Sequence, residues 1–261
     1  MDRNHIEKIA QTPEDKLLLA KVWDKVNTGI RKNILAASPF LTPREQEMCR
    51  YLFGSEPGLT FFGGYAGAER RMLIYLPEYL DESALCDADA PLVCIHAEFY
   101  EGDALTHRDL LGALMGAGIA RETVGDLLID GSACDFLVSR TIAPYILQNL
   151  TSAGRTKLRL AQIPLSQLHI PQLQVKEIRD TLASLRLDSV VSSGFRISRG
   201  LAAQYISAGK VAIDGLPCEK PDKIIAEGAK ISLRGSGKIL LAAIGGKSKK
   251  ERICVTIHRY I

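Results

Sequence analysis

The sequence predicts an α+β protein with three parts, on the evidence of chain length, hydrophobic periodicity and the order of expected elements. Its 261 residues exceed the usual length of one domain. Helical periodicity dominates residues 1–80, strands and helices alternate in residues 81–175, and two short helices with a tight hairpin follow in residues 181–261. We therefore expect a mainly helical N-terminal domain, a mixed middle domain and a small α/β C-terminal domain.

Two helices with strong start signals dominate the N-terminal region. Thr12 precedes Pro13 and two acidic residues, which is the pattern of an N-cap, a proline at the first helical position and an acidic first turn. Thr42 and Glu45 form the pattern of a capping box for a second helix, which Gly54 ends. Apolar side chains recur along the first helix at helical spacing, so we expect one face of it to be core.

A glycine-rich segment, FFGGYAGAERR at residues 61–71, has two interpretations. Three glycines beside Arg70 and Arg71 could form a phosphate-binding loop, but the pattern GxxxxGK[ST] is absent. The expected structure is instead a hairpin, in which the glycines permit positive φ and lead into a strand at residues 71–76.

The middle region has the pattern strand, helix, strand, strand, helix, strand. These elements are expected at residues 91–99, 107–116, 126–129, 133–138, 141–150 and 157–163. Thr106 is the expected cap of the first helix, and Asp130-Gly131 the turn between two strands. The order is that of the ferredoxin-like fold, which RNA-recognition motifs share. The base-stacking aromatic pattern of those motifs is missing from residues 134–138, so the order predicts the fold more strongly than an RNA role for the sheet.

The C-terminal region is organised around RLDSVVSSGFRISRGLAAQYISAGKVAIDGLPCEK at residues 186–220. A first helix is expected from Leu187 and a second after Ser198, followed by a strand at residues 210–213. The expected breaks are Gly194 for the first helix, Gly209 for the second, and Asp214-Gly215 as the hairpin turn.

Positive charge is concentrated in the same region. Residues 181–261 hold 14 Lys and Arg against 6 Asp and Glu, while the preceding 180 residues hold 19 against 24. A basic third on an acidic body indicates a polyanion-binding C-terminal domain attached to a body that does not bind polyanions throughout. Four cations, Arg186, Arg196, Arg199 and Lys210, surround the two short helices; a solvated surface is the alternative explanation for them.

The order of helix, R-x-x-R, G-K-V and D-G in this region resembles the αL RNA-binding motif of the S-four domain. Four further segments, FFGGYxGAERR at 61–71, HRDLLGALM at 107–115, GIxRExVGD at 118–126 and SKK at 248–250, extend the resemblance to the bacterial YlmH family over nearly the full chain. The resemblance implies a cytoplasmic RNA-binding protein that acts on the large ribosomal subunit with tRNA, in rescue of stalled translation and with a link to cell division. Glu251 departs from the expected glycine in the basic tail.

We therefore expect structured rRNA or tRNA to be bound through the C-terminal domain, because guanidinium groups and the first N–H groups of a helix both bind phosphate. The expected contacts are Arg186, Ser192, Arg196, Ser198, Arg199, Gln204, Lys210, Arg234, Lys247, Lys249, Lys250 and Arg252. Candidate secondary contacts to RNA or tRNA are Arg70, Arg71, His107 and Arg108, for which a hairpin end and a first helical turn are equally good explanations.

Catalysis is not expected. His96 and His107 lie near acidic residues and Ser132 follows a turn, but no GxSxG, HExxH, dinucleotide-binding or paired-carboxylate pattern is present. The alternative is an rRNA-modifying enzyme of the pseudouridine synthase or methyltransferase type with an S-four accessory domain. That enzyme needs a catalytic Asp in a synthase-type loop or a glycine-rich cofactor loop, and neither is visible in the sequence. We expect no cofactor.

Cysteine spacing and hydropathy predict a cytoplasmic protein. The six cysteines are scattered without a C-x-x-C pair, which favours reduced thiols and argues against a zinc site. No apolar run approaches the roughly 18 residues of a membrane span, and the N-terminus lacks a signal-peptide core. A monomer is the expected state.

Overall fold

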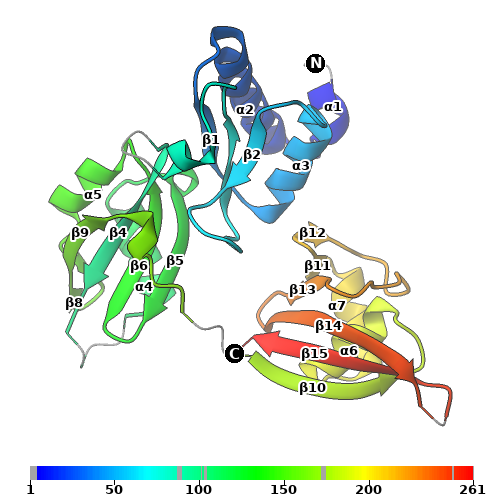
Figure 1. Cartoon of the computed structure of the whole chain (residues 1–261). Coiled ribbons are helices and arrows are strands. Elements are labelled where there is room, and N and C mark those ends of the chain that lie inside the picture. The colour runs from blue at the N-terminus through cyan, green and yellow to red at the C-terminus, as the bar shows by residue number, and fades with distance from the viewer. Residues whose placement is uncertain are drawn as a thin grey trace. The chain divides into compact units, whose positions relative to one another are not determined.

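The computed structural model describes residues 5–86, 90–100, 102, 105–171, 175–248 and 250–260. The protein has the predicted α+β class and divides into two compact units, Met1–Pro171 and Gln172–Ile261 (Figure 1). Each unit is described by itself. A further division of the first unit near residue 80 stays a prediction.

The first part of unit 1 combines helices with a three-stranded antiparallel sheet of order β1-β3-β2. The helices are α1 (Ile6–Ile9), α2 (Pro13–Lys32) and α3 (Pro43–Phe53), and the strands are β1 (Ala36–Leu41), β2 (Leu59–Phe62) and β3 (Arg71–Tyr75). Thr42 forms the predicted capping box, Thr12 is the predicted N-cap of α2 and also forms a capping box with Asp15, and Gly54 ends α3. Strand β1 is absent from the sequence-based prediction because AASPFL contains a proline, and its register with β3 is irregular.

Helices α2 and α3 are joined by a buried ion pair. Asp15, in the first turn of α2, accepts hydrogen bonds from Arg44 at 2.6 and 2.7 Å. These bonds outweigh the effect of burial and lower the pKa of Asp15 to about 2. The core beside the pair contains Leu19, Val22 and Val26 of the predicted stripe.

The second part of unit 1 has the predicted β-α-β-β-α-β order. The elements are β4 (Leu92–Glu98), α4 (His107–Gly116), β5 (Val124–Asp130), β6 (Ala133–Ser139), α5 (Ala143–Asn149) and β9 (Arg159–Ile163). The strands form an antiparallel sheet of order β5-β6-β4-β9, which is the ferredoxin-like arrangement. A small hairpin of β7 (Ser152–Ala153) and β8 (Thr156–Lys157) precedes β9, and short 3-10 helices lie at Glu82–Leu85, Arg121–Thr123 and Leu165–Gln167.

The two faces of this sheet have different partners. One face carries Ile95 and Phe136 and packs in a core with Leu110 of α4 and Ile146 of α5. Residues of the opposite face, Leu92, Cys94 and Leu137, share a core with Phe40, Met72 and Ile74 of the first sheet. In an RNA-recognition motif that second face binds RNA. Here part of it is buried within unit 1.

Unit 2 is a six-stranded antiparallel sheet of order β10-β15-β14-β13-β11-β12, with two helices on one face (Figure 1). Its elements are β10 (Val175–Leu182), α6 (Leu187–Phe195), α7 (Arg199–Ser207), β11 (Val211–Ile213), β12 (Leu216–Pro217), β13 (Lys230–Leu233), β14 (Gly237–Lys247) and β15 (Ile253–Tyr260). Gly209 ends α7 with a φ of 66°, and Asp214 and Gly215 form the predicted turn with φ of 49° and 83°.

One prediction in this unit is wrong. Gly194 does not end the first helix: α6 continues through it to Phe195, and Arg196 provides the left-handed C-cap with a φ of 55°. A Cβ at Gly194 would lie only 2.5 Å from Ile239 Cδ1, so this glycine permits close packing of α6 on the sheet.

Candidate nucleic-acid interface

The start of α6 and the start of α7 meet around one buried carboxylate. Asp188, in the first turn of α6, is 5% exposed. Arg186 donates to it from Nε at 3.3 Å and Nη2 at 3.1 Å, and Arg199 donates from Nη2 at 3.1 Å. Burial acts to raise the pKa of Asp188, but the hydrogen bonds from both arginines outweigh it and leave the pKa below its ordinary value. The charged carboxylate therefore holds two of the predicted RNA contacts in fixed positions.

Both arginines also remain accessible. The side chain of Arg186 is 37% exposed and that of Arg199 is 52% exposed. A guanidinium group has five N–H donors, so each side chain retains donors for a second acceptor. We call Arg186, Asp188 and Arg199 the Asp188 clamp. Its geometry suits phosphate oxygens, which accept from arginine in the same bidentate manner as a carboxylate does.

The turn between the two helices lies beside the clamp and carries Arg196. The Arg196 side chain is exposed and has no partner within the described part of the chain. Two serines fix this turn: the Ser192 hydroxyl donates to Ile197 O at 2.7 Å, and Ser198 accepts from Leu201 N at 3.2 Å as the predicted N-cap. Both serines therefore have structural bonds of their own.

A second basic pair follows α7. Lys210 comes directly after that helix, and its Nζ lies 5.1 Å from the centroid of the Tyr205 ring. Arg234 donates its backbone N–H to Lys210 O at 3.0 Å, so the structure brings these two predicted contacts together. Gln204 is exposed on α7.

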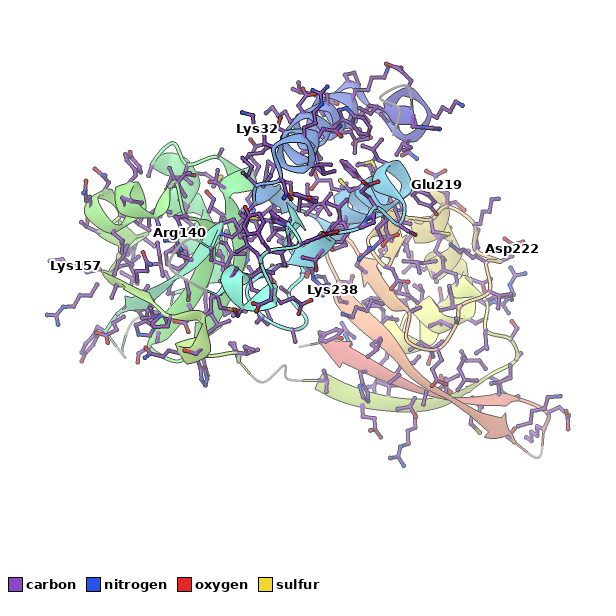
Figure 2. The ribbon with its side chains drawn as sticks, turned by 45° about the horizontal axis from the view of Figure 1, so that its top comes forward. Lys32, Arg140, Lys157, Glu219, Asp222 and Lys238 are labelled. Atoms are coloured by element: carbon purple, nitrogen blue, oxygen red, sulfur yellow. The ribbon has the colours of Figure 1, made fainter. Side chains whose placement is uncertain are left out.

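Acidic residues also occur beside these cations. Glu219 and Asp222 both belong to the segment between β12 and β13 (Figure 2). Asp222 is exposed, and its charge acts on Arg186. It therefore gives a control for the effect of removing one negative charge near the clamp.

The basic tail lies at the hairpin between β14 and β15 and is partly neutralised. Glu251, the residue that departs from the family pattern, pairs with Lys247 at 2.7 Å. Arg252 donates to Thr181 Oγ1 at 3.1 Å, and Lys250 is exposed. Lys249 lies outside the described residues.

The candidate secondary contacts belong to two segments of unit 1, residues 70–71 and 107–108, and both lie near Asp126. Asp126 accepts from Tyr65 Oη at 2.9 Å, from Glu69 N at 2.6 Å and from Arg70 N at 3.0 Å. The Arg70 side chain donates inward, to Val124 O at 3.0 Å and Phe40 O at 2.9 Å. Burial lowers its pKa, consistent with a guanidinium that supports the protein backbone.

Arg121, which the sequence analysis did not select, lies near Arg70 and Asp126. Its Nη1 donates to Val124 O at 2.5 Å, and burial together with the charge of Arg70 lowers its pKa to about 10. Burial and the charge of Arg121 lower the pKa of His107 in turn. His107 and Arg108 lie in the first turn of α4 and are exposed, although the imidazole of His107 is partly buried. Thr106 is the predicted cap of this helix, and Asp109 forms a capping box with it.

Of the possible catalytic groups, His96 has a structural partner. His96 Nδ1 lies 2.6 Å from Asp135 Oδ1, and the buried Asp135 also accepts His169 N–H at 2.7 Å, which ties the segment after β9 to the sheet. Burial raises the pKa of the Cys94 and Cys134 thiols to about 12, which makes them poor nucleophiles. Within the described ranges, no three His, Cys, Asp or Glu side chains group as a metal site.

Asp188 and Asp126 are the two carboxylates at the candidate sites that the sequence analysis missed. Both lie inside segments that it quoted, as RLD and VGD. The available signal was their position beside apolar residues, Leu187 and Val190 for Asp188 and Leu127 for Asp126. A carboxylate in such a setting needs partners when the segment is buried.

Comparisons with known proteins agree with this architecture. The family model described as "Putative RNA-binding domain in YlmH" matches residues 97–167, and the S4 domain model matches residues 185–231. "Ribosome-associated protein quality control protein P2" of Bacillus subtilis (strain 168) is 38% identical over 222 residues, which cover 84% of this chain and 85% of that protein.

A solved structure gives independent support for the fold. "Cell division protein ylmH from Streptococcus pneumoniae" matches with a TM-score of 0.50 at 17% identity, over 62% of this chain and 98% of that chain. Among the described residues, no helix is both long and apolar enough to cross a membrane. The predicted resemblance is confirmed by the Bacillus relative and by the two domain matches: the chain belongs to the YlmH family of RNA-binding S4-domain proteins.

Proposed function

We propose that this chain binds structured rRNA or tRNA on the large ribosomal subunit, as a non-catalytic factor in quality control of stalled translation that is linked to cell division. The name of the Bacillus relative supports the ribosomal role, and the name of the Streptococcus structure supports the link to division. In this proposal the chain is a cytoplasmic monomer without a cofactor. In this proposal the first unit holds two domains, residues 1–80 and 81–171, and the RNA-binding domain expected at residues 181–261 begins earlier, because β10 pairs with β15.

The observation that carries the proposal is the Asp188 clamp beside the exposed Arg196. A buried carboxylate that orders two half-exposed arginines prepares them for a second set of acceptors. Arg196 and the N-terminus of α7 extend the same surface toward a further phosphate. Such a surface fits the backbone of folded RNA, which proteins recognise largely by shape and by phosphate and 2′-hydroxyl contacts.

The test is sedimentation of the full chain with purified ribosomal subunits at increasing salt. We expect association with the large subunit at low salt and release as salt rises, because phosphate contacts depend on counterion release. Arg196→Gly should weaken the association without unfolding the protein, since glycine accepts the positive φ at this position. Arg179→Gln is the matched control, because Arg179 is an exposed arginine on β10 whose partner is Glu177.

The same experiment separates binding from RNA modification. The bound RNA should carry no pseudouridine or methyl group that depends on this protein. A protein-dependent modification would contradict the non-catalytic proposal even if the chain associated with ribosomes. Failure to associate with either subunit, with the protein folded, would contradict the ribosomal proposal.

A further inference from the structure

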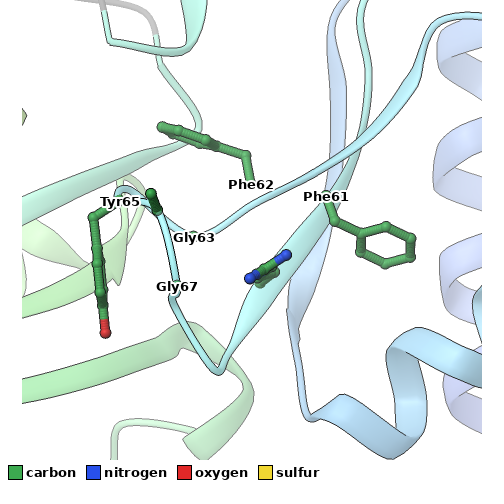
Figure 3. Close-up of a pocket in the computed structure, with 7 residues that line it drawn as sticks. Phe61, Phe62, Gly63, Tyr65 and Gly67 are labelled. Atoms are coloured by element: carbon green, nitrogen blue, oxygen red, sulfur yellow. The ribbon is translucent and has the colours of Figure 1, made fainter. Parts of the chain in front are cut away.

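An open pocket lies at the glycine-rich loop between β2 and β3 (Figure 3). Its volume is about 290 Å³, and its walls are three aromatic residues, the loop backbone and Arg71. None of the lining residues is acidic. The pocket belongs to unit 1 and is separate from the Asp188 clamp.

The loop is held in shape before any ligand arrives. Asp126 anchors it through the Tyr65 hydroxyl and two backbone N–H groups. A Cβ at Gly63 would lie 2.5 Å from Ala68 Cβ, so only glycine lets the two ends of the loop approach each other this closely. Gly67 has a φ of 92°, and a Cβ there would meet nothing within 4 Å, as expected at the wall of an open pocket. A preformed site binds its ligand with less loss of entropy.

Arg71 supplies a positive charge with free donors. Its Nε donates to Ala68 O at 2.7 Å, which fixes the plane of the guanidinium group. The two terminal nitrogens have no partner within the described part of the chain. Arg71 thus differs from Arg70, whose donors are engaged by backbone carbonyls. A fixed guanidinium with two free nitrogens fits a phosphate group.

The aromatic walls suit a planar ring. Phe62 and Tyr65 both project away from Phe61, in different directions (Figure 3). Each packs partly against the core that contains Phe40 and Leu137 and stays half-exposed, so part of each ring is accessible. Phe61 is already covered by Arg50, whose guanidinium carbon lies 4.6 Å from the ring centroid. Bases of single-stranded nucleic acid commonly stack on such aromatic side chains.

We propose that this pocket binds one unpaired nucleotide, with its phosphate on Arg71 and its base against Phe62 or Tyr65. The volume is of the order needed for a single nucleotide. The inference depends on the proposed RNA-binding function only for the source of the nucleotide, which is either single-stranded RNA or a free nucleoside monophosphate.

The test is nuclear magnetic resonance of the ¹⁵N-labelled full chain, titrated with AMP, CMP, GMP and UMP and with tetranucleotides of adenosine and uridine. We expect saturable shifts of the Gly63 and Gly67 amide signals. Arg71→Gln should weaken this binding by about tenfold, the usual loss for one charge-assisted contact. Arg155→Gln, an exposed arginine of unit 1 outside the pocket, should have no effect.

The results test whether the pocket binds a nucleotide and show whether that nucleotide comes from RNA or is free. Shifts with tetranucleotides alone indicate RNA, and shifts with both probes indicate a free nucleotide as well. Absence of shifts at these glycines with every probe, or equal affinity of wild type and a folded Arg71→Gln variant, overturns the inference. If the Arg71→Gln variant unfolds, Arg71→Lys, which keeps the positive charge, is titrated in its place. Binding of a structured RNA is measured in parallel with the Arg196→Gly and Arg155→Gln variants. Arg196→Gly should weaken it and Arg155→Gln should leave it unchanged, whatever the nucleotide titration gives, so either proposal can fail alone.

Discussion

Replacing Asp188 with asparagine should weaken RNA binding, although it removes a negative charge from the proposed RNA-binding surface. Simple electrostatics predicts the opposite, because one carboxylate fewer means less repulsion of phosphate. The Asp188 clamp gives the reason for the reversal: without the charged carboxylate, Arg186 and Arg199 lose the partner that orders them. The sign of the change in affinity therefore tests the role of this residue.

The size of the effect follows from the two arginines. Immobilising one long side chain at an interface costs about 0.5–1.5 kcal/mol, so ordering two costs about 1–3 kcal/mol at the moment of binding. After allowance for the reduced repulsion, we expect RNA affinity to fall by about tenfold. Stability should fall by about 2 kcal/mol, because hydrogen bonds between charged groups contribute about 1.5–3 kcal/mol each and both arginines are partly exposed to solvent. That loss corresponds to a melting temperature of unit 2 about 8–16 °C lower.

The assay compares wild type, Asp188→Asn and Asp222→Asn by fluorescence anisotropy with a labelled structured RNA, at a temperature where circular dichroism shows all three folded. Asp222 is exposed near Arg186, so its replacement removes the same charge without touching the clamp. Asp222→Asn should leave stability within about 0.5 kcal/mol of wild type and leave affinity unchanged or slightly higher. Tighter RNA binding by a folded Asp188→Asn variant would refute the positioning role.

Three further predictions concern single residues in both units. Arg196→Gly should reduce RNA affinity and flatten the slope of log K against log salt by at most about 0.9, with a melting temperature that is unchanged or higher; a lower melting temperature with RNA affinity intact would show that Arg196 is structural. Arg44 and two backbone N–H groups lower the pKa of Asp15 to about 2 in the folded protein, so the charged Asp15 should add about 1–2 kcal/mol above pH 4 and lose it as pH falls toward 2; acid titration of Arg44→Gln should show a smaller loss, and an equal loss would contradict the role of Arg44. Gly194→Ala should destabilise unit 2 by about 1–3 kcal/mol in urea unfolding, because the new methyl group meets Ile239, and an unchanged midpoint would contradict that packing.

The elements that the sequence predicted correctly are those with local signals. The capping box at Thr42, the cap at Thr106 and the turn at Asp214 depend on residues within three positions, and the structure contains each of them. Each strand and helix from residue 91 onward was also predicted from its own segment, and their order indicated the ferredoxin-like arrangement.

The features that the sequence did not predict depend on distant partners. Glycine often ends a helix, but Gly194 lies inside α6, where the missing side chain lets the helix pack closely on Ile239 of β14. Asp188 forms the centre of the clamp only when α7 brings Arg199 against it. Asp126 is 57 positions from Glu69, whose N–H it accepts, and neither segment alone indicates the contact. Local propensity carries no information on such pairs, because they form only in the packed structure.

The most direct test of RNA binding by the Asp188 clamp and Arg196 is ultraviolet crosslinking of the full chain to purified large ribosomal subunits, with crosslinked peptides identified by mass spectrometry. We predict that rRNA or tRNA crosslinks concentrate in residues 186–210, and that Arg196→Gly and Asp188→Asn reduce them while Arg179→Gln leaves them unchanged. Crosslinks confined to residues 1–171, or an unchanged pattern in both variants, would contradict RNA binding through this surface.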